Sequence, residues 1–423
     1  MSHYDVAIVG AGMVGASLAC GLIDAGFNVA LIEAGQLDSQ QNWPKDKVDP
    51  RVSALSLASQ NLLSHIGAWP LIEQMGRLQP YKAMQVWDGC GTGKLSFTAA
   101  EQHLPYLGNI LENRTITSAL HQLLEAKSYT LFEQSSIVDM TPEGESPRRL
   151  TLADGQTLSA TLIVGADGAN SKVRQLAGLP TREWDYPHHA LVTRVRVSVP
   201  HQDTAWQRFT ENGILAFLPL SSPTPVTSDA GDEHFCSIVW SQPQSQADAM
   251  AALDDDAFCS ALSRAFEGRL GSVLGADQRY VIPLRQRHAK RYVQQGLVVV
   301  GDAAHTIHPL AGQGVNLGLL DVAALVQTLV EGRDAGQELG KLELLEHYQT
   351  LRRSDNLRMM ALMESFARLF GNQHPMLSLL RNTGMNWMQK LTPIKQHLAQ
   401  QAMGVGAHLP PLSQAPQPIK NSV

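Results

Sequence analysis

The chain has 423 residues, of which 44% are hydrophobic and 17% are charged, and its formal net charge is −6. This composition suits a soluble globular protein with a large core, and the negative charge argues against a nucleic-acid-binding surface. The four cysteines are far apart and form no C-x-x-C pair, so neither a disulfide framework nor a zinc site is expected.

A strand–helix–strand unit opens the chain. Residues 4–9 (YDVAIV) and 28–33 (NVALIE) predict short buried strands, and ASLACGLIDAG between them predicts a helix. Such a unit implies a parallel sheet. The N-terminus lacks a basic leader and no long apolar run follows, so we expect no signal peptide, no transmembrane helix and a cytoplasmic location.

The turn between the first strand and the helix carries Gly10-x-Gly12-x-x-Gly15. In a dinucleotide-binding turn, the first glycine allows the tight bend, the second admits a pyrophosphate, and the third lets helix and strand pack closely. Free N–H groups at the helix start attract the phosphates. Glu33 ends the second strand, where an acid accepts hydrogen bonds from ribose hydroxyls. The pattern predicts dinucleotide binding, against the alternative of an ordinary tight turn.

The middle of the chain changes texture. Residues 53–68 and 114–126 predict helices, and 161–166 (TLIVGA) predict another buried strand. From residue 187 to 245, ALVTRVRVSV, GILAFLPL and HFCSIVWS alternate as strands do, which indicates a mostly antiparallel sheet in a second layer or domain.

Two short stretches invite other interpretations. GCGTGKLSF at 89–97 is similar to a phosphate-binding loop, but Asp88 stands where that motif needs glycine, so we interpret it as a hairpin turn. Residues 251–270 predict a helix, and the run Asp254–Asp256 is interpreted as its N-terminal cap.

A second glycine cluster, GDAAHTIHPLAGQGVNLG at 301–318, follows the buried strand pattern LVVV. Asp302 is placed to bond the ribityl hydroxyls of a flavin. Backbone N–H groups from Gly312 to Asn316 would face the pyrimidine side of the flavin ring, where a helix starting near Gly314 stabilises negative charge. Two such turns favour FAD, with one for the pyrophosphate and one for the ring.

His305 and His308 also lie in this cluster. They stand three residues apart, and no cysteine or acid completes a set of metal ligands. We therefore expect no metal site and interpret both histidines as packing near the cofactor.

These motifs, with GADGANSKVR at 165–174, resemble the class A flavoprotein aromatic hydroxylases, the p-hydroxybenzoate hydroxylase-like family. The resemblance implies that Asp167 and Gly168 lie near both FAD and the pyridine nucleotide. It implies that Arg51 lies beside the flavin and its phosphates, and that Pro309 lies against the flavin ring. Pro309 and Gly314 would form the environment of the reacting ring, and no catalytic acid or base is assigned.

The family fold is an α/β Rossmann-type FAD-binding domain interleaved with a mostly antiparallel β-sheet substrate domain, followed by a C-terminal helical region. We predict a discontinuous FAD-binding domain over residues 1–75, 105–182 and 280–340, and a substrate domain over residues 76–104 and 183–279. A helical region is predicted over residues 341–403, and a disordered Pro-rich tail over residues 404–423.

Within the family, RVSALSLAS, LVTRVRV and GILAFLPLS resemble the ubiquinone-biosynthesis hydroxylases (the UbiH/UbiF/VisC group), and YPHHALV and QAMGV resemble most the VisC/UbiI branch that oxidises ring carbon five. The resemblance implies hydroxylation of a polyprenylated phenol through a flavin hydroperoxide. O₂ would be the co-substrate, and NADPH or another reductant would be the transient electron donor. The alternatives are a sister hydroxylase acting at carbon six or one, another flavoprotein of this superfamily, and a non-enzymatic lipid-binding protein resembling GDP-dissociation inhibitors.

Substrate and partner contacts are less sharply marked. GILAFLPL, with Phe217, is expected to line an apolar pocket, and His189 is a further candidate; a plain core or surface role is open for both. Residues 365–423 carry +5 whereas residues 1–364 carry −11. This basic, Met-rich end could contact the inner membrane surface or other ubiquinone-biosynthesis proteins, or could be an ordinary helical subdomain.

Overall fold

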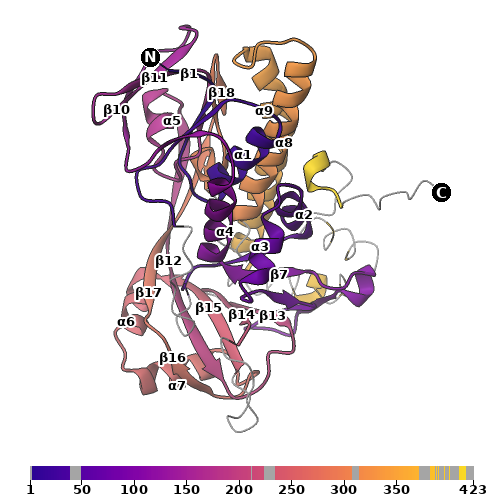
Figure 1. The fold of residues 1–423 in the computed structure, drawn as a ribbon. Helices are drawn as coiled ribbons and strands as arrows, with labels where there is room; N and C mark the ends of the chain where they lie inside the picture. Colours follow the sequence, from indigo (N-terminus) through magenta and orange to yellow (C-terminus); the bar gives the residue numbers. More distant parts are fainter. Residues whose placement is uncertain are drawn as a thin grey trace, which may run out of the picture.

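A parallel sheet and a mostly antiparallel sheet form the two main parts of the molecule, and long strands run from one to the other (Figure 1). The computed structural model describes residues 2–38, 49–210, 212–222, 234–306, 314–370, 382–385 and 409–415, and the single residues 387, 389, 395 and 400.

The first sheet is built on the parallel strands that the sequence predicts. Its parallel part runs β19 (Leu297–Val299), β11 (Thr157–Gly165), β1 (His3–Val9), β2 (Val29–Ile32) and β8 (Thr130–Phe132). Antiparallel strands extend it, namely β18 (Val293–Gln294), β10 (Arg148–Leu152) and β9 (Ile137–Met140). The central strands are almost wholly buried because helices cover the sheet, which explains their uninterrupted apolar sequences.

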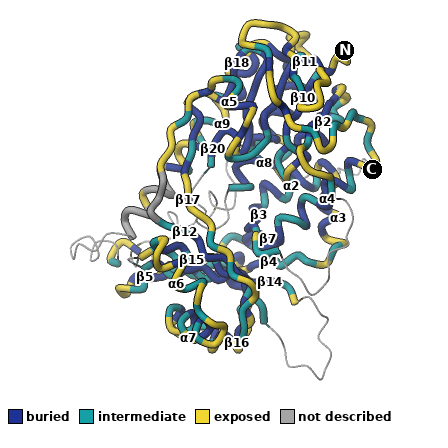
Figure 2. The backbone as a smooth tube through the Cα atoms, turned by 90° about the vertical axis from the view of Figure 1, so that its left-hand side faces the viewer, coloured by how far each residue is buried: buried dark blue, intermediate teal, exposed yellow. Residues whose placement is uncertain are grey.

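Four long helices and a short one accompany this sheet. They are α1 (Met13–Asp24), α4 (Asn113–Glu125), α8 (Gly314–Asp334), α9 (Leu342–Phe370) and α5 (Lys172–Leu176). Figure 2 shows the buried positions gathered where α8 meets the strands. By length and composition α8 could cross a membrane, but 67% of its most apolar window is buried inside the protein, as in a core helix.

The second sheet is mostly antiparallel, as predicted. Its order is β20 (His305–Thr306), β17 (Tyr280–Ala289), β12 (Thr181–Val197), β15 (His234–Pro243), β14 (Gly213–Leu220), β13 (Thr204–Thr210), β5 (Ala83–Asp88) and β6 (Lys94–Thr98), with β16 (Val273–Ala276) beside β12. Only β13 and β5 pair in parallel among these described strands. Helices α6 (Gln244–Ala251) and α7 (Asp255–Ala265) pack on this sheet, so residues 251–270 hold parts of two helices rather than one.

A small third sheet corrects one sequence prediction. The helix predicted over residues 53–68 is present only as α2 (Leu57–His65), because Val52–Leu55 forms β3 and pairs with β7 (Gly108–Glu112). β4 (Gln79–Tyr81) pairs with the other edge of β7, and α3 (Trp69–Gln74) follows α2. The apolar spacing of this segment fits both structures, and the pairing partner lies more than 50 residues away.

Two turn predictions are confirmed. β5 and β6 pair antiparallel around residues 89–93, so GCGTG is a hairpin turn. Asp254 is the N-cap of α7, and its side chain accepts a hydrogen bond from the Ala257 N–H at 2.8 Å.

The C-terminal part is described only in places. Asn382 and Met385 pack on the β5–β6 hairpin. Within the predicted disordered tail, Pro411–Ser413 form the short 3-10 turn η4, and the Ser413 carbonyl accepts a hydrogen bond from Asn61 on α2 at 3.1 Å. This portion of the tail is therefore structured, whereas residues 404–408 and 416–423 lie outside the described residues.

Candidate flavin site

The three glycine and aspartate motifs meet at one edge of the parallel sheet. Gly10 follows the end of β1, Asp167 follows β11, and Gly301 follows β19. These strands are direct neighbours, so their carboxyl ends bring together segments almost 300 residues apart in the chain. In parallel α/β sheets, ligands bind at this edge.

The three glycines before α1 have different surroundings. Gly10 has a φ of +101°, and a Cβ there would lie 2.5 Å from the Ala166 carbonyl oxygen. A Cβ at Gly15 would overlap the Gly10 carbonyl oxygen. A Cβ at Gly12 meets no described atom within 4 Å, and Gly12 is the N-cap of α1 without a side-chain cap. The turn is thus tight on the protein side and open where the helix N–H groups emerge.

Two side chains hold this turn in place. Glu33 Oε2 accepts a hydrogen bond from the Ala11 N–H at 2.6 Å, and Oε1 accepts one from the Gly35 N–H at 2.8 Å. The buried His121 on α4 donates from Nε2 to the Ala11 carbonyl at 2.7 Å and accepts at Nδ1 from the Asp38 N–H at 2.9 Å. Glu33 is predicted at this site from the sequence, but His121 is not, since a single histidine on a helix carries no motif.

The motif after β11 forms a short cap. Asp167 Oδ2 accepts from the backbone N–H groups of Lys172 at 2.6 Å and Val173 at 3.0 Å, at the start of α5. Its Oδ1 is buried and has no hydrogen-bond partner in the described structure. A Cβ at Gly168 would meet no described atom within 4 Å. A buried acceptor without a donor, next to open space, is where a ligand hydroxyl or N–H group fits.

Arg174 links this motif to the second glycine turn. It is almost fully buried, and it donates to the carbonyl oxygens of Ala303 at 2.7 Å and Ala169 at 2.8 Å. Burial, and secondarily the charge of Arg287, lower its pKa. The guanidinium thus joins two motifs far apart in sequence.

Asp302 lies on the 3-10 turn η2 (Gly301–Ala303) and is exposed, although both its neighbours are buried. The turn is fixed from behind, since the Ala304 carbonyl accepts from the Ala289 N–H on β17 at 2.7 Å. The residue is exposed at the sheet edge, but the surrounding protein desolvates the Asp302 carboxyl group and raises its pKa. A carboxyl group held on such a turn fits the predicted role of binding ribityl hydroxyls.

Asn316, in the first turn of α8, has a further structural role. Its Oδ1 accepts from the Ser56 N–H at 2.9 Å and the Ser59 hydroxyl at 2.7 Å, and its Nδ2 donates to the Ala54 carbonyl at 2.8 Å. The side chain therefore ties the start of α8 to the junction of β3 and α2. A Cβ at Gly314 would meet no described atom within 4 Å.

The other predicted flavin residues are only partly placed. Arg51 immediately precedes β3, and its side chain is 70% exposed, 4.0 Å from Asp49. Pro309 and Gly312 lie outside the described residues, as does His308.

Phe217 does not point toward the flavin motifs. Its ring stacks on Phe266 with 3.8 Å between centroids, in the cluster that α7 covers. The neighbouring Leu218 faces the opposite way and packs with Ala54 on β3. Because side chains alternate along a strand, the Leu218 face lies nearer to the site, and Phe217 is a core residue.

The two adjacent histidines of β12, His188 and His189, lie on opposite faces of the sheet, as Phe217 and Leu218 do. Val192 pairs with Val239, which pairs with Ala216, so the even-numbered residues of β12 share the Leu218 face. His188 belongs to this face, and burial lowers its pKa. His189 belongs to the other face, and its Nδ1 is buried without a hydrogen-bond partner in the described part of the chain. The structure thus favours His188 over the predicted His189 as a pocket residue.

Comparison with known proteins agrees with this site. Residues 3–362 match a family model described as an FAD binding domain. The chain is 37% identical over 409 residues to the 3-demethoxyubiquinol 3-hydroxylase of Escherichia coli (strain K12), covering 95% of this chain and 98% of that protein. It is 34% identical over 442 residues to the mitochondrial ubiquinone biosynthesis monooxygenase COQ6 of Xenopus tropicalis, covering 93% and 92%. The chain belongs to the ubiquinone-biosynthesis hydroxylase family.

The fold of this hydroxylase also has solved counterparts. PqsL of Pseudomonas aeruginosa, in complex with 2-aminobenzoylacetate, has a TM-score of 0.74 at 21% identity, covering 91% of this chain and 99% of that one. This likeness concerns the fold alone, and it confirms the predicted p-hydroxybenzoate hydroxylase-like architecture. The match to the FAD binding domain and the similarity to the two relatives above show that the chain is an FAD-dependent monooxygenase.

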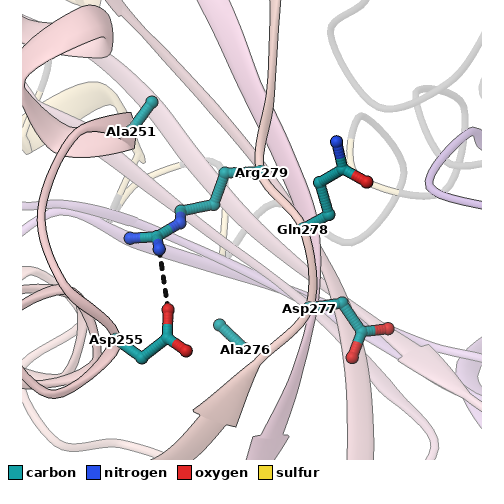
Figure 3. A pocket seen from close by; sticks show the side chains of 6 residues that line it. All are labelled: Ala251, Asp255, Ala276, Asp277, Gln278 and Arg279. Carbon is teal, nitrogen blue, oxygen red and sulfur yellow. Dashed lines mark hydrogen bonds and ion pairs between the residues drawn. The ribbon is translucent and has the colours of Figure 1, made fainter.

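The charged side chains around one hollow of the second sheet are paired with each other or with a neighbour. A hollow beside α6 and α7 is lined by Ala251, Asp255, Ala276, Asp277, Gln278 and Arg279 (Figure 3). Arg279 bonds Asp255 at 2.7 Å, and Asp277 bonds Arg194 at 2.7 Å, so these charges are paired. Among the residues that the structure describes, no three His, Cys, Asp or Glu side chains gather as metal ligands.

Proposed function

We propose that this hydroxylase inserts an oxygen atom into the aromatic ring of a polyprenylated phenol in ubiquinone biosynthesis. FAD is its cofactor, O₂ its co-substrate, and NADPH or another reductant its transient electron donor. The open N-terminus of α1 beside the exposed Asp302, in a family of ubiquinone-biosynthesis enzymes, is the observation that carries this proposal.

The residues described here fit FAD. The N–H groups at Gly12 would hold the pyrophosphate, Glu33 the ribose, and Asp302 the ribityl chain, with Arg51, Asp167 and Gly168 beside them. Gly312, Gly314 and Pro309 would border the ring. The bound flavin supplies the oxygen-activating chemistry, and the protein positions the phenol and keeps water out.

The face of the second sheet that carries Leu218 is our candidate for the substrate wall. Leu218 and Leu220 pack in one apolar cluster with Ala54, directly beside the β3–α2 junction that Asn316 holds. A prenylated ring needs such an apolar surface, with few polar groups to orient it. This assignment replaces Phe217, which faces α7.

For the ring position we propose carbon five. The strings YPHHALV and QAMGV, which resemble the VisC/UbiI branch, support this choice. The name of the E. coli relative refers to a different step, the hydroxylation of 3-demethoxyubiquinol. The competing assignment is therefore a sister hydroxylase of the pathway that acts at carbon six or at carbon one.

The C-terminal region is proposed to meet the inner membrane surface or other proteins of the pathway. Residues 365–423 carry +5, and Trp387 is 67% exposed while Met385 is buried against the β5–β6 hairpin. A chain truncated after Glu364 should bind anionic vesicles less than the full chain; equal binding by a folded truncated chain would contradict this proposal.

Deleting the gene in its host tests the ring position. Mass spectrometry and NMR of the quinone precursor that accumulates under oxygen should show a prenylated phenol lacking the carbon-five oxygen. A demethoxyquinone, or a precursor blocked at carbon one, would assign the protein to a sister step. An unchanged quinone pool would contradict the proposed pathway role.

A further inference from the structure

A buried polar cluster lies behind the second glycine turn. The predicted motif contributes Gly301 and His305 to it, and its other members lie on α8 and α9. At its centre is Asp321 on α8, which is fully buried. Its carboxylate is within hydrogen-bond distance of the Gly301 N–H (3.1 Å), His305 Nε2 (2.6 Å), Arg352 Nε (2.9 Å) and Asn356 Nδ2 (3.2 Å).

The two carboxylate oxygens serve different elements. Oδ2 contacts Gly301, the first residue of the short turn that carries Asp302, and His305, which follows that turn at the start of β20. Oδ1 contacts Arg352 and Asn356, both on α9. One side chain therefore brackets the exposed Asp302 from both sides and connects its turn to two long helices.

The Asp321 carboxylate is paired with the Arg352 guanidinium at 2.9 Å. Burial by itself would raise the pKa of Asp321, but His305 and Arg352 hold it well below its ordinary value. The carboxylate is therefore ionised and can only accept hydrogen bonds, so His305 must donate from Nε2. Hydrogen bonds to a buried charge are shorter and stronger than neutral ones, and they fix geometry closely.

A purely structural role does not explain why these charged groups are buried, because their desolvation costs free energy. Burying an ion pair gives little net stability compared with apolar packing of the same volume, whereas a fully bonded network selects one geometry. Its location, directly behind the turn that carries Asp302 at the cofactor edge, indicates what that geometry serves.

We propose that Asp321 and His305 are positioning residues for the flavin, because they fix the turn that presents Asp302. The inference rests on the proposed role of Asp302 as a cofactor ligand. It does not depend on which phenol is the substrate.

The test compares two substitutions at His305 in the full chain. His305→Phe keeps an aromatic ring but removes the donor, and should raise the dissociation constant for FAD about tenfold. His305→Gln can still donate an N–H toward Asp321 and should recover most of the affinity. The dissociation constant is measured by flavin fluorescence, and the midpoint potential of the bound flavin should shift in His305→Phe only.

His288→Phe is the matched control. His288 is as buried as His305 and pairs with it across β17 and β20, but it bonds the Tyr292 hydroxyl at 3.0 Å instead of Asp321. It should lower the melting temperature and leave the FAD affinity unchanged. Wild-type affinity in His305→Phe, or equal weakening in His288→Phe, would overturn the proposal.

Asp302→Ala separates this inference from the function. It should weaken FAD binding at least as much as His305→Phe, and unaltered binding would overturn the basis of the inference. None of these measurements contains a phenol, so a wrong substrate assignment would leave their outcome unaffected.

Discussion

The three glycines of the first turn, Gly10, Gly12 and Gly15, leave different amounts of room for an added methyl group. Gly15 lies against the Gly10 carbonyl, whereas Gly12 faces open space at the start of α1. The Gly15 contact is part of the fold, whereas Gly12 is our proposed position for the pyrophosphate, although both residues form one sequence motif.

Gly15→Ala and Gly12→Ala should therefore fail in different ways. The Gly15 methyl group overlaps backbone that cannot move aside, and should lower the free energy of unfolding by about 1–3 kcal/mol or more. The Gly12 methyl group should leave the melting temperature of the FAD-free protein unchanged but weaken FAD binding. Thermal unfolding and FAD titration of both variants check this. A lower melting temperature in Gly12→Ala would contradict the open space beside Gly12.

His288 makes stability depend on pH. Burial, and secondarily the charge of His305, lower its pKa from 6.5 to about 4. The folded state thus prefers the neutral ring, so this contribution to stability is complete above pH 6.5 and is lost as the pH falls toward 4. His288→Phe should make the free energy of unfolding less dependent on pH between about 4 and 6.5. An unchanged pH dependence would mean that other groups cause it.

At the scale of single residues, the sequence predicts what a motif contains and misses what packs behind it. Glu33 and Asp302 stand at fixed distances from glycines, so their positions follow from the strand and turn. His121 and Asp321 contact backbone that is far away in the chain, and nothing in their own neighbourhoods marks them. Phe217 shows a further limit, because alternation defines two strand faces without saying which one meets the cofactor.

Among the elements, α7 has a sharply defined beginning. Asp254 caps it through the Ala257 N–H, and Asp255 and Asp256 follow in the first turn. Asp254→Ala should lower the unfolding free energy by about 1 kcal/mol, while Asp256→Ala removes only a favourable charge and should cost less. Chemical denaturation of both variants measures the difference, and equal losses would contradict the cap.

The glycines of the β5–β6 hairpin leave room for the C-terminal segment that packs on it. A Cβ at Gly93 would lie 2.8 Å from Asn382 Oδ1 and 2.9 Å from Met385 Sδ. Gly93→Val should therefore loosen the C-terminal segment and speed its removal in limited proteolysis. Gly275→Val is the control, since a Cβ there meets no described atom within 4 Å. Equal proteolysis of the two variants would show that the contact does not hold the segment.

Element types follow from the sequence where burial is complete or alternation is regular. The segments VALI of β2 and LIVG of β11 are apolar and buried because helices cover their sheet, and GILAFLPL is a strand of the second sheet. Residues 53–68 mislead because an apolar strand and an apolar helix start look alike over four residues, and only pairing with β7 decides between them.

At the scale of the whole molecule, adjacency of strands creates the site. β1, β11 and β19 are neighbours with parallel direction, so the turns that follow them converge at one edge. The strands β12 and β17 connect this edge to the second sheet, whose Leu218 face lies beside β3. The sequence predicts each motif separately, and the three-dimensional order of the strands unites them.

The most direct test of the account is a turnover under isotopically labelled dioxygen. The FAD-loaded protein, a reductant and a prenylated phenol are incubated together, and the product is analysed by mass spectrometry. The account predicts one labelled oxygen atom on the aromatic ring for each turnover. A ring oxygen taken from water, or no hydroxylated product from any prenylated phenol of the pathway although the flavin is reduced and reoxidised, would contradict it.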